Sequence, residues 1–331
     1  MVKHLLDLPD QVLSLVMAAH LGGGGRDPDL GGLDVACKDT RRLFLEWITT
    51  VTWSNENRCC QSDDLAFVAE KCKNVTSIKI NDNGDLVDVQ HLSRHLSTLT
   101  GLQAMSMNGT RIANTWHLSA LTGLRMLDVS NSGFADVGHL SALTELQRLD
   151  MSYNTKVADV GPLSTLTGLQ ILNMRSCCGI TDVKPLSALT GLQTLDVGVT
   201  KVVDIGPLSA LTRLRTINVS WTNIADVGPL SALTGLQTLH MGSTNVTDVG
   251  PLSTLTRLRT INVSWTNIAD IGPLSSLTGL QTLDMRGCTN VIDVGPLAAL
   301  TGLKTLGMRG CYEKTDVGPL AALTGLKTLG L

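Results

Sequence analysis

The chain has 331 residues, of which 43% are hydrophobic and 3% aromatic, and its formal net charge at pH 7 is -3. The chain lacks the net positive charge that is typical of nucleic-acid-binding domains, so nucleic acid is not an expected partner. The low aromatic content indicates a core of Leu, Val and Ile layers.

The first apolar stretch is too short for a membrane span and fits a secretory signal poorly. It runs for ten residues from Val12 to Leu21, which is too short to cross a bilayer. Asp7, Pro9 and Asp10 interrupt the region in which a signal peptide would lead from basic residues into an apolar run. We therefore expect no membrane association and a cytoplasmic or nuclear location.

Residues 1–47 carry apolar residues at helical spacing behind a Leu-Pro opening. The segment LPDQVLSLVMAAHL is followed by DLGGLDVACKDTRRL. The pattern resembles an F-box, which begins Leu-Pro-x-Glu and continues Leu-x-x-Leu-x-x-Val-Cys-Lys. The resemblance implies helices that dock on a Skp-family adaptor of a cullin complex, and the matching positions are Leu8, Pro9, Val12, Leu13, Val16, Leu30, Leu33 and Cys37.

Several residues depart from the F-box pattern. Gln11 replaces the usual acid, Ala36 replaces Val and Thr40 replaces an aromatic residue. The glycine-rich loop over 22–29 is also longer than the family pattern. The alternative is that these helices only cap the repeats that follow.

Residues 48–80 are expected to form an entry or capping repeat. The segment SDDLAFVAEKCKNVTSIKI resembles the entry repeat of F-box leucine-rich proteins, in which a helix ending near a Cys leads into a strand. Val75, Ile78 and Ile80 would be the buried residues of that strand.

From residue 81 to 331 a single pattern recurs about eleven times at steps of 22 or 23 residues. The leucines that open the copies are Leu102, Leu124, Leu146, Leu169, Leu192, Leu214, Leu236, Leu258, Leu280, Leu303 and Leu326. A fixed period of this length is typical of a stacked solenoid. The 22-residue copies resemble internalin-type leucine-rich repeats, and the 23-residue copies with MRSCCGITDVKPL or MRGCTNVIDVGPL resemble the cysteine-containing repeats of F-box proteins. The dense succession of copies such as LSALTGLQTLDV also resembles leucine-rich proteins of kinetoplastid protists.

Each copy predicts a short strand, a polar turn and a helical turn. In L-x-x-L-x-L the alternating apolar residues indicate a strand with one buried face. The resemblance therefore implies an α/β leucine-rich repeat solenoid, with parallel strands on the concave face and short 3-10 turns on the convex face. In each copy the turn carries Thr, Ser, Asn or Cys at one equivalent position. This row of residues, the polar ladder, should satisfy buried backbone groups. The repeated Asp of D-[VI]-x-[PH]-L should cap the helical turn, in which Pro is favoured.

Two further features concern the cysteines and the last strand. Eight cysteines in a chain of this length do not form a disulfide framework, and Cys177, Cys288 and Cys311 share one repeat position, which indicates a packing role in a reducing compartment. The chain stops at Leu331 inside a strand motif without a C-terminal cap. We expect either a partner at that strand edge or a fragment of a longer protein.

The strand positions that are not buried should form a concave face for a protein partner. Trp and Arg are the usual anchors of protein interfaces. The candidate residues on this face are Arg125, Arg148, Tyr153, Arg175, Arg215, Trp221, His240, Arg259, Trp265, Arg286 and Arg309. Because NVSWTNIAD occurs twice, the alternative is that Trp265 is a duplicate of Trp221 without a role of its own.

No catalytic constellation is expected. Cys59-Cys60 and Cys177-Cys178 lack zinc-ligand spacing, and the glycine run over 22–25 is not followed by the Lys-Ser/Thr of a phosphate loop. The sequence therefore predicts a non-enzymatic protein–protein interaction module without cofactor or metal. The F-box resemblance favours the substrate-recognition subunit of an SCF-type E3 ubiquitin ligase. The alternatives are a leucine-rich scaffold or adhesin-like binder without a ligase connection, and a regulatory subunit of a phosphatase or nucleotide-switch enzyme.

Overall fold

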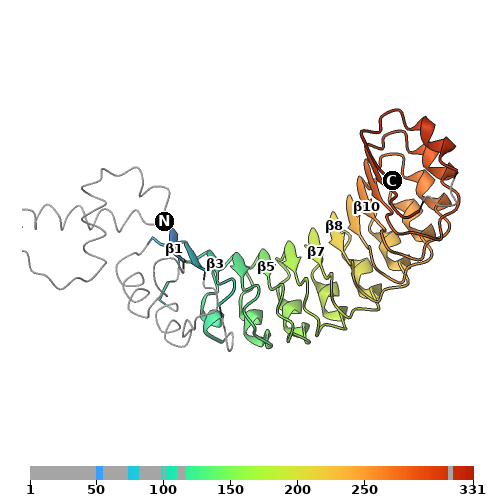
Figure 1. Ribbon diagram of the computed structural model, residues 1–331. Coiled ribbons are helices and arrows are strands. Elements are labelled where there is room, and N and C mark those ends of the chain that lie inside the picture. Colours follow the sequence, from blue (N-terminus) through green and yellow to red (C-terminus); the bar gives the residue numbers. More distant parts are fainter. Residues whose placement is uncertain (1–49, 55–73, 82–97, 100, 111–115, 312–315) are drawn as a thin grey trace, which may run out of the picture.

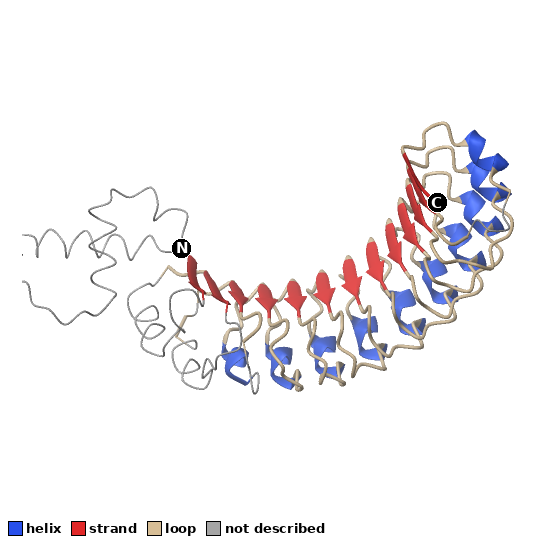
Figure 2. Ribbon diagram, in the orientation of Figure 1, coloured by secondary structure: helices blue, strands red, loops and turns tan. Residues whose placement is uncertain are grey.

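The computed structural model describes residues 50–54, 74–81, 98–99, 101–110, 116–311 and 316–331. These residues stack into an arc of repeats (Figure 1). The strands line the inner side of the arc and the helical turns its outer side (Figure 2). The strands form one 13-stranded sheet in chain order, in which the neighbouring strands pair in parallel. The predicted leucine-rich repeat solenoid is confirmed.

The strands are short, because the chain turns toward the outer side of the arc after only one buried strand residue in each repeat. From β3 onward every strand has three residues, for example β9 at Thr238–His240, and its central side chain points into the core except at the last strand. The bounds are β1 Thr50–Ser54, β2 Ser77–Asn81, β3 Ala104–Ser106, β4 Met126–Asp128, β5 Arg148–Asp150, β6 Ile171–Asn173, β7 Thr194–Asp196, β8 Thr216–Asn218, β9 Thr238–His240, β10 Thr260–Asn262, β11 Thr282–Asp284, β12 Thr305–Gly307 and β13 Thr328–Gly330.

The register of the sheet stacks equivalent residues of all repeats. Leu239 of β9 lies between Ile217 of β8 and Ile261 of β10, and all three are fully buried. Since successive side chains of a strand alternate between its faces, the two flanking residues of each strand point to the concave side. The buried Val75, Ile78 and Ile80 continue the same core, with Ile78 and Ile80 in β2.

A 3-10 helix follows each described turn on the outer side. The bounds are η2 Trp116–Ala120, η3 Gly138–Ala142, η4 Gly161–Thr165, η5 Lys184–Ala188, η6 Gly206–Ala210, η7 Gly228–Ala232, η8 Gly250–Thr254, η9 Gly272–Ser276, η10 Gly295–Ala299 and η12 Gly318–Ala322. The repeated Asp lies one residue before the N-cap, and its carboxylate accepts a hydrogen bond from the first N–H of the turn, as in Asp226 and Gly228 at 2.7 Å. The capping role is thus confirmed, at a position one residue earlier than in a standard N-cap.

The polar ladder is confirmed and has two forms. In the 22-residue repeats from 192 to 279 the ladder Thr donates to a carbonyl of its own repeat, as in Thr222 to Val219 at 2.6 Å. In the 23-residue repeats the ladder residue reaches the preceding repeat, as in Cys177 to Met151 at 3.2 Å and Cys288 to Val263 at 3.1 Å. Asn154 does both, since it donates to Val129 of the preceding repeat at 2.9 Å and to Met151 of its own repeat at 2.8 Å. The ladder therefore links some repeats and only closes the turn of others.

The described part of the chain contains no helix that is long and apolar enough to cross a membrane. The expected F-box-like segment 1–47 lies outside the described residues. Of the expected entry repeat 48–80, β1 and β2 are described; β1 pairs with β2, and β2 pairs with β3. The end of the array is less covered than its middle, since Leu329 of β13 is 43% exposed and Leu239 is fully buried.

Candidate protein-binding face

The concave face consists of the two flanking residues of each strand. The first flanking residue is Thr in every repeat from Thr194 onward, and it is half-buried through Thr305. The strands β4, β5 and β6 carry larger side chains at this position, namely the exposed Met126 and Arg148 and the half-buried Ile171. The face is therefore bulkiest at these three strands.

The second flanking residue belongs mainly to the scaffold. Asn218 donates to Asp196 in the adjacent strand at 2.9 Å, and its Oδ1 accepts from the N–H of Ser220 at 3.0 Å. Asn173 and Asp150 repeat the side-chain contact at 2.9 Å. This row of Asp and Asn is half-buried and ends each strand by an Asx-type turn. It leaves little hydrogen-bonding capacity for a partner.

His240 occupies the same row between Asn218 and Asn262. Burial lowers the pKa of His240, and the attraction of Asp196 and Asp284 opposes that shift only in part. The imidazole is therefore neutral at neutral pH, like the amides beside it. No catalytic partner is arranged around it in the described residues.

The turn after each strand requires a left-handed backbone. Gly109, Gly287 and Gly310 occupy this position with φ of 75°, 71° and 84°. Tyr153, Trp221, Trp265 and Val199 are the bulky residues there. Trp221 and Trp265 have φ of 60° and 58°, a conformation that costs a non-glycine residue roughly 1–2 kcal/mol. Strain of this kind is concentrated at functional sites.

The two tryptophans are both exposed and held in place. Trp221 and Trp265 are 63% and 67% exposed. The backbone N–H of Trp221 donates to the carbonyl of Gly242 at 2.9 Å, and the backbone N–H of Trp265 donates to the carbonyl of Arg286 at 2.7 Å. The indole of Trp265 lies over Gly287, where an added methyl group would clash with its six-membered ring. The rings are thus presented to solvent from a fixed backbone.

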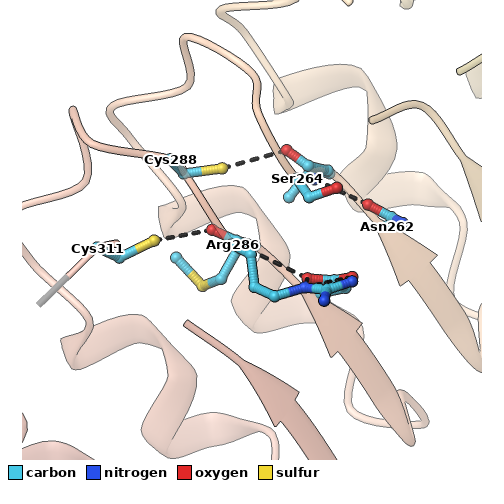
Figure 3. A network of polar contacts seen from close by, with 8 residues as sticks. Asn262, Ser264, Arg286, Cys288 and Cys311 are labelled. Carbon is cyan, nitrogen blue, oxygen red and sulfur yellow. Dashed lines mark hydrogen bonds and ion pairs between the residues drawn. The ribbon is translucent and has the colours of Figure 1, made fainter. Parts of the chain in front are cut away.

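Arginines accompany these aromatic residues along the same edge. Arg286 is exposed, and its guanidinium forms a paired contact with Asp284, with Nη2 to Oδ2 at 2.6 Å and Nε to Oδ1 at 2.9 Å (Figure 3). Arg175 is half-buried and lies over Gly198, and Arg309 is exposed. We call Tyr153, Trp221, Trp265, Arg175, Arg286 and Arg309 the aromatic ridge.

The ladder cysteines are buried in the core beneath the aromatic ridge. Cys288 donates to Val263 at 3.1 Å and Cys311 to Met285 at 2.8 Å, so each thiol points to a backbone carbonyl (Figure 3). Burial raises the pKa of Cys177 to about 12, which keeps that thiol protonated as a donor. Cys177, Cys178 and Cys288 are free thiols. Among the described residues no group of three or more His, Cys, Asp or Glu is suited to a metal ion.

The predicted concave residues lie in the strands and at the two edges of the sheet. Arg125, Arg215 and Arg259 are exposed just before their strands, Arg148 and His240 lie in strands, and Tyr153, Arg175, Trp221, Trp265, Arg286 and Arg309 follow strands. The predicted adaptor-binding residues Leu8, Pro9, Val12, Leu13, Val16, Leu30, Leu33 and Cys37 lie outside the described residues. The sequence prediction missed Arg213 and Arg257, although each replaces the Gly of the LTGL motif.

Known proteins resemble this chain chiefly through its repeats. A family model for leucine-rich repeats, in two copies, matches residues 144–188. An internalin of Listeria monocytogenes is similar over 88% of both chains, with 25% identity and a TM-score of 0.76. The functional domain of a second internalin of that organism, InlJ, which includes a cysteine ladder, is 19% identical with a TM-score of 0.67, over 88% of this chain and 64% of that domain.

A leucine-rich repeat protein of Leptospira interrogans shares the fold with 13% identity and a TM-score of 0.64, over 88% of this chain and 86% of that protein. No curated protein sequence matches the chain. The matched family model and the internalin similarity identify a leucine-rich repeat scaffold for protein–protein interaction, and none of these matches is to a catalytic family.

Proposed function

We propose that the concave face holds a protein partner and that the aromatic ridge anchors it. The observation that carries this proposal is the pair Trp221 and Trp265, exposed at a left-handed turn position that other repeats fill with Gly, Asn, Ser, Val or Tyr. A turn selected only for folding would favour the less strained residues. The strained tryptophans instead supply rigid apolar surface with few rotatable bonds, which is the composition of interface hot spots.

The double variant Trp221→Asn with Trp265→Asn tests this anchoring. We expect the affinity for a captured protein to fall at least about 30-fold per tryptophan, because hot-spot truncation costs about 2 kcal/mol or more. Thermal stability should not fall, since Asn tolerates the left-handed turn. The measurement is quantitative affinity capture from cell extract, followed by titration of the captured protein.

A matched control removes equally exposed apolar residues outside the ridge. Val203 and Ile292 are 59% and 66% exposed and follow the ladder position. The variant Val203→Asn with Ile292→Asn should retain capture. Equal capture by all three proteins would show that Trp221 and Trp265 are products of duplication without a binding role.

The finer proposal is that this scaffold is the substrate-recognition subunit of an SCF-type E3 ubiquitin ligase. It is supported by the F-box resemblance of residues 1–47, from Leu8-Pro9 to Cys37-Lys38. The partner on the concave face would then be held near a cullin complex, and ubiquitin transfer would be performed by other subunits. The internalin similarity supports the second candidate, a repeat scaffold or adhesin-like binder whose N-terminal segment only caps the array.

Adaptor capture separates these two candidates. Full-length protein should bind a purified Skp-family adaptor, and a protein lacking residues 1–47 should not, because the apolar docking face would be gone. The truncated protein must retain capture of the concave-face partner, which serves as the folding control. If the full-length protein does not bind the adaptor, the ligase assignment fails and the scaffold assignment remains.

A further inference from the structure

A basic hollow lies at the edge where the strands begin, apart from the aromatic ridge. It has a volume of about 290 Å³ and is lined by Gln193, Thr212, Arg213, Arg215, Gly235 and Arg257. These residues come from the segments that precede β7, β8, β9 and β10. The hollow therefore spans four consecutive repeats near the middle of the arc.

The charge in this hollow is uncompensated. No acidic residue lines it, and the three arginines are exposed. Within the described parts of the chain, Arg213, Arg215 and Arg257 form no ion pair or side-chain hydrogen bond, whereas the neighbouring Arg259 donates to the carbonyl of Gly279 at 2.6 Å. Three guanidinium groups around one hollow repel one another, and an anion between them would relieve this repulsion.

The sequence builds this arrangement from an alternating pattern. The segment LTRLRTINVSWTNIAD occurs unchanged at 211–226 and at 255–270. The repeat between the copies carries Gly235 and Gln237 at the positions of Arg213 and Arg215. Arginines from both sides thus face a repeat with no side chain at Gly235. Other repeats also place Gly at this position, so folding alone does not require arginine there.

We propose that the hollow binds an oxyanion, a phosphate group, carried by the protein partner on the concave face. The guanidinium fork matches phosphate and carboxylate oxygens in a paired geometry. Three guanidinium groups offer more donors than one carboxylate accepts, and a phosphoryl group presents three strong acceptor oxygens. A phosphorylated side chain is therefore the favoured source, and an acidic side chain is the second source of the same chemistry. This inference rests on the proposed protein-binding function.

Binding of inorganic phosphate to the full-length protein tests the hollow directly. Titration followed by ³¹P NMR at constant ionic strength should give saturable binding to the wild-type protein. The variant Arg213→Gln, Arg215→Gln, Arg257→Gln should bind at least about tenfold more weakly, because each charge-assisted hydrogen bond contributes enough for a factor of ten. Lys184→Gln is the control for the loss of a positive charge and should bind normally, since Lys184 is exposed in η5 on the outer side of the arc, away from the hollow.

A second pair of variants keeps all three arginines. Gly235→Glu should abolish phosphate binding by placing a carboxylate in the hollow, and Gly235→Gln should retain it. Both side chains fit, because a Cβ at Gly235 would lie 3.6 Å from its nearest neighbour and Glu145 already occupies the equivalent position of another repeat. Unchanged phosphate binding in the triple arginine variant or in Gly235→Glu would overturn the proposal.

Two further probes identify the source of the anion. Phosphate binding at least about tenfold tighter than acetate binding assigns the hollow to a phosphorylated side chain, and equal binding assigns it to acidic side chains. Tight, strongly salt-dependent binding of a single-stranded oligonucleotide at these arginines would overturn the protein-partner assignment. The variant Trp221→Asn with Trp265→Asn should retain phosphate binding, so the hollow and the aromatic ridge can fail independently.

Discussion

Replacing Asn154 by Ala should destabilise the protein by about 3 kcal/mol or more, because this one side chain satisfies several buried backbone groups. Its Oδ1 accepts from the N–H groups of Ser132 and Gly133 at 3.0 and 2.8 Å. Its Nδ2 donates to the carbonyls of Val129 and Met151 at 2.9 and 2.8 Å. Each buried group left without a partner costs about 1–3 kcal/mol. The free energy of unfolding from urea denaturation measures the loss.

Thr222→Ala is the comparison within the same ladder. Thr222 is buried and donates one hydrogen bond, to Val219 of its own repeat at 2.6 Å. Its removal should cost about 1 kcal/mol, the usual net value of one such bond. Asn154→Thr should lie between the two variants, because Thr can keep the bond within the repeat but not the bonds to its neighbour. Equal losses for Asn154→Ala and Thr222→Ala would contradict a cross-repeat role of Asn154.

The repeat core was predictable because every copy restates the same pattern. Leu236, Leu239 and Met241 are the apolar residues of one L-x-x-L-x-L copy, and all three are buried, as that pattern predicts. The division of the ladder was not predictable, because whether a side chain reaches its own repeat or the preceding one depends on how the turns stack. The strand β1 was also missed, since TVTWS lacks the leucine spacing that identifies the other strands.

The concave residues could be aligned from the sequence, but their backbone could not. Tryptophan is an improbable residue for a left-handed turn, and the signal that the position requires one was the aligned Gly109, Asn131, Gly287 and Gly310. The hollow was missed for another reason. Arg213 and Arg257 are ordinary surface residues one at a time, and only the stacking of four repeats shows that they face the same space.

Leu239→Ala should cost about 2–5 kcal/mol, the range for truncating a fully buried leucine in a close-packed core. Leu239 is fully buried in the stacked row between Ile217 and Ile261, so neither neighbouring strand can fill the cavity without moving its own repeat. Urea denaturation should report the loss in free energy of unfolding, and amide hydrogen exchange should rise first in β8 and β10. A repeat contacts only its neighbours, so protection at β4 should change least.

The same substitution at Leu329 is the control, because Leu329 occupies the equivalent row position but is 43% exposed. It should cost less than about 1 kcal/mol, since much of its apolar surface is already in water. If both substitutions cost the same, stability would not follow burial along the array. If Leu239→Ala raised exchange equally in all strands, the solenoid would unfold as one cooperative unit. Short-range coupling would instead leave the aromatic ridge and the basic hollow sensitive mainly to the repeats that carry them.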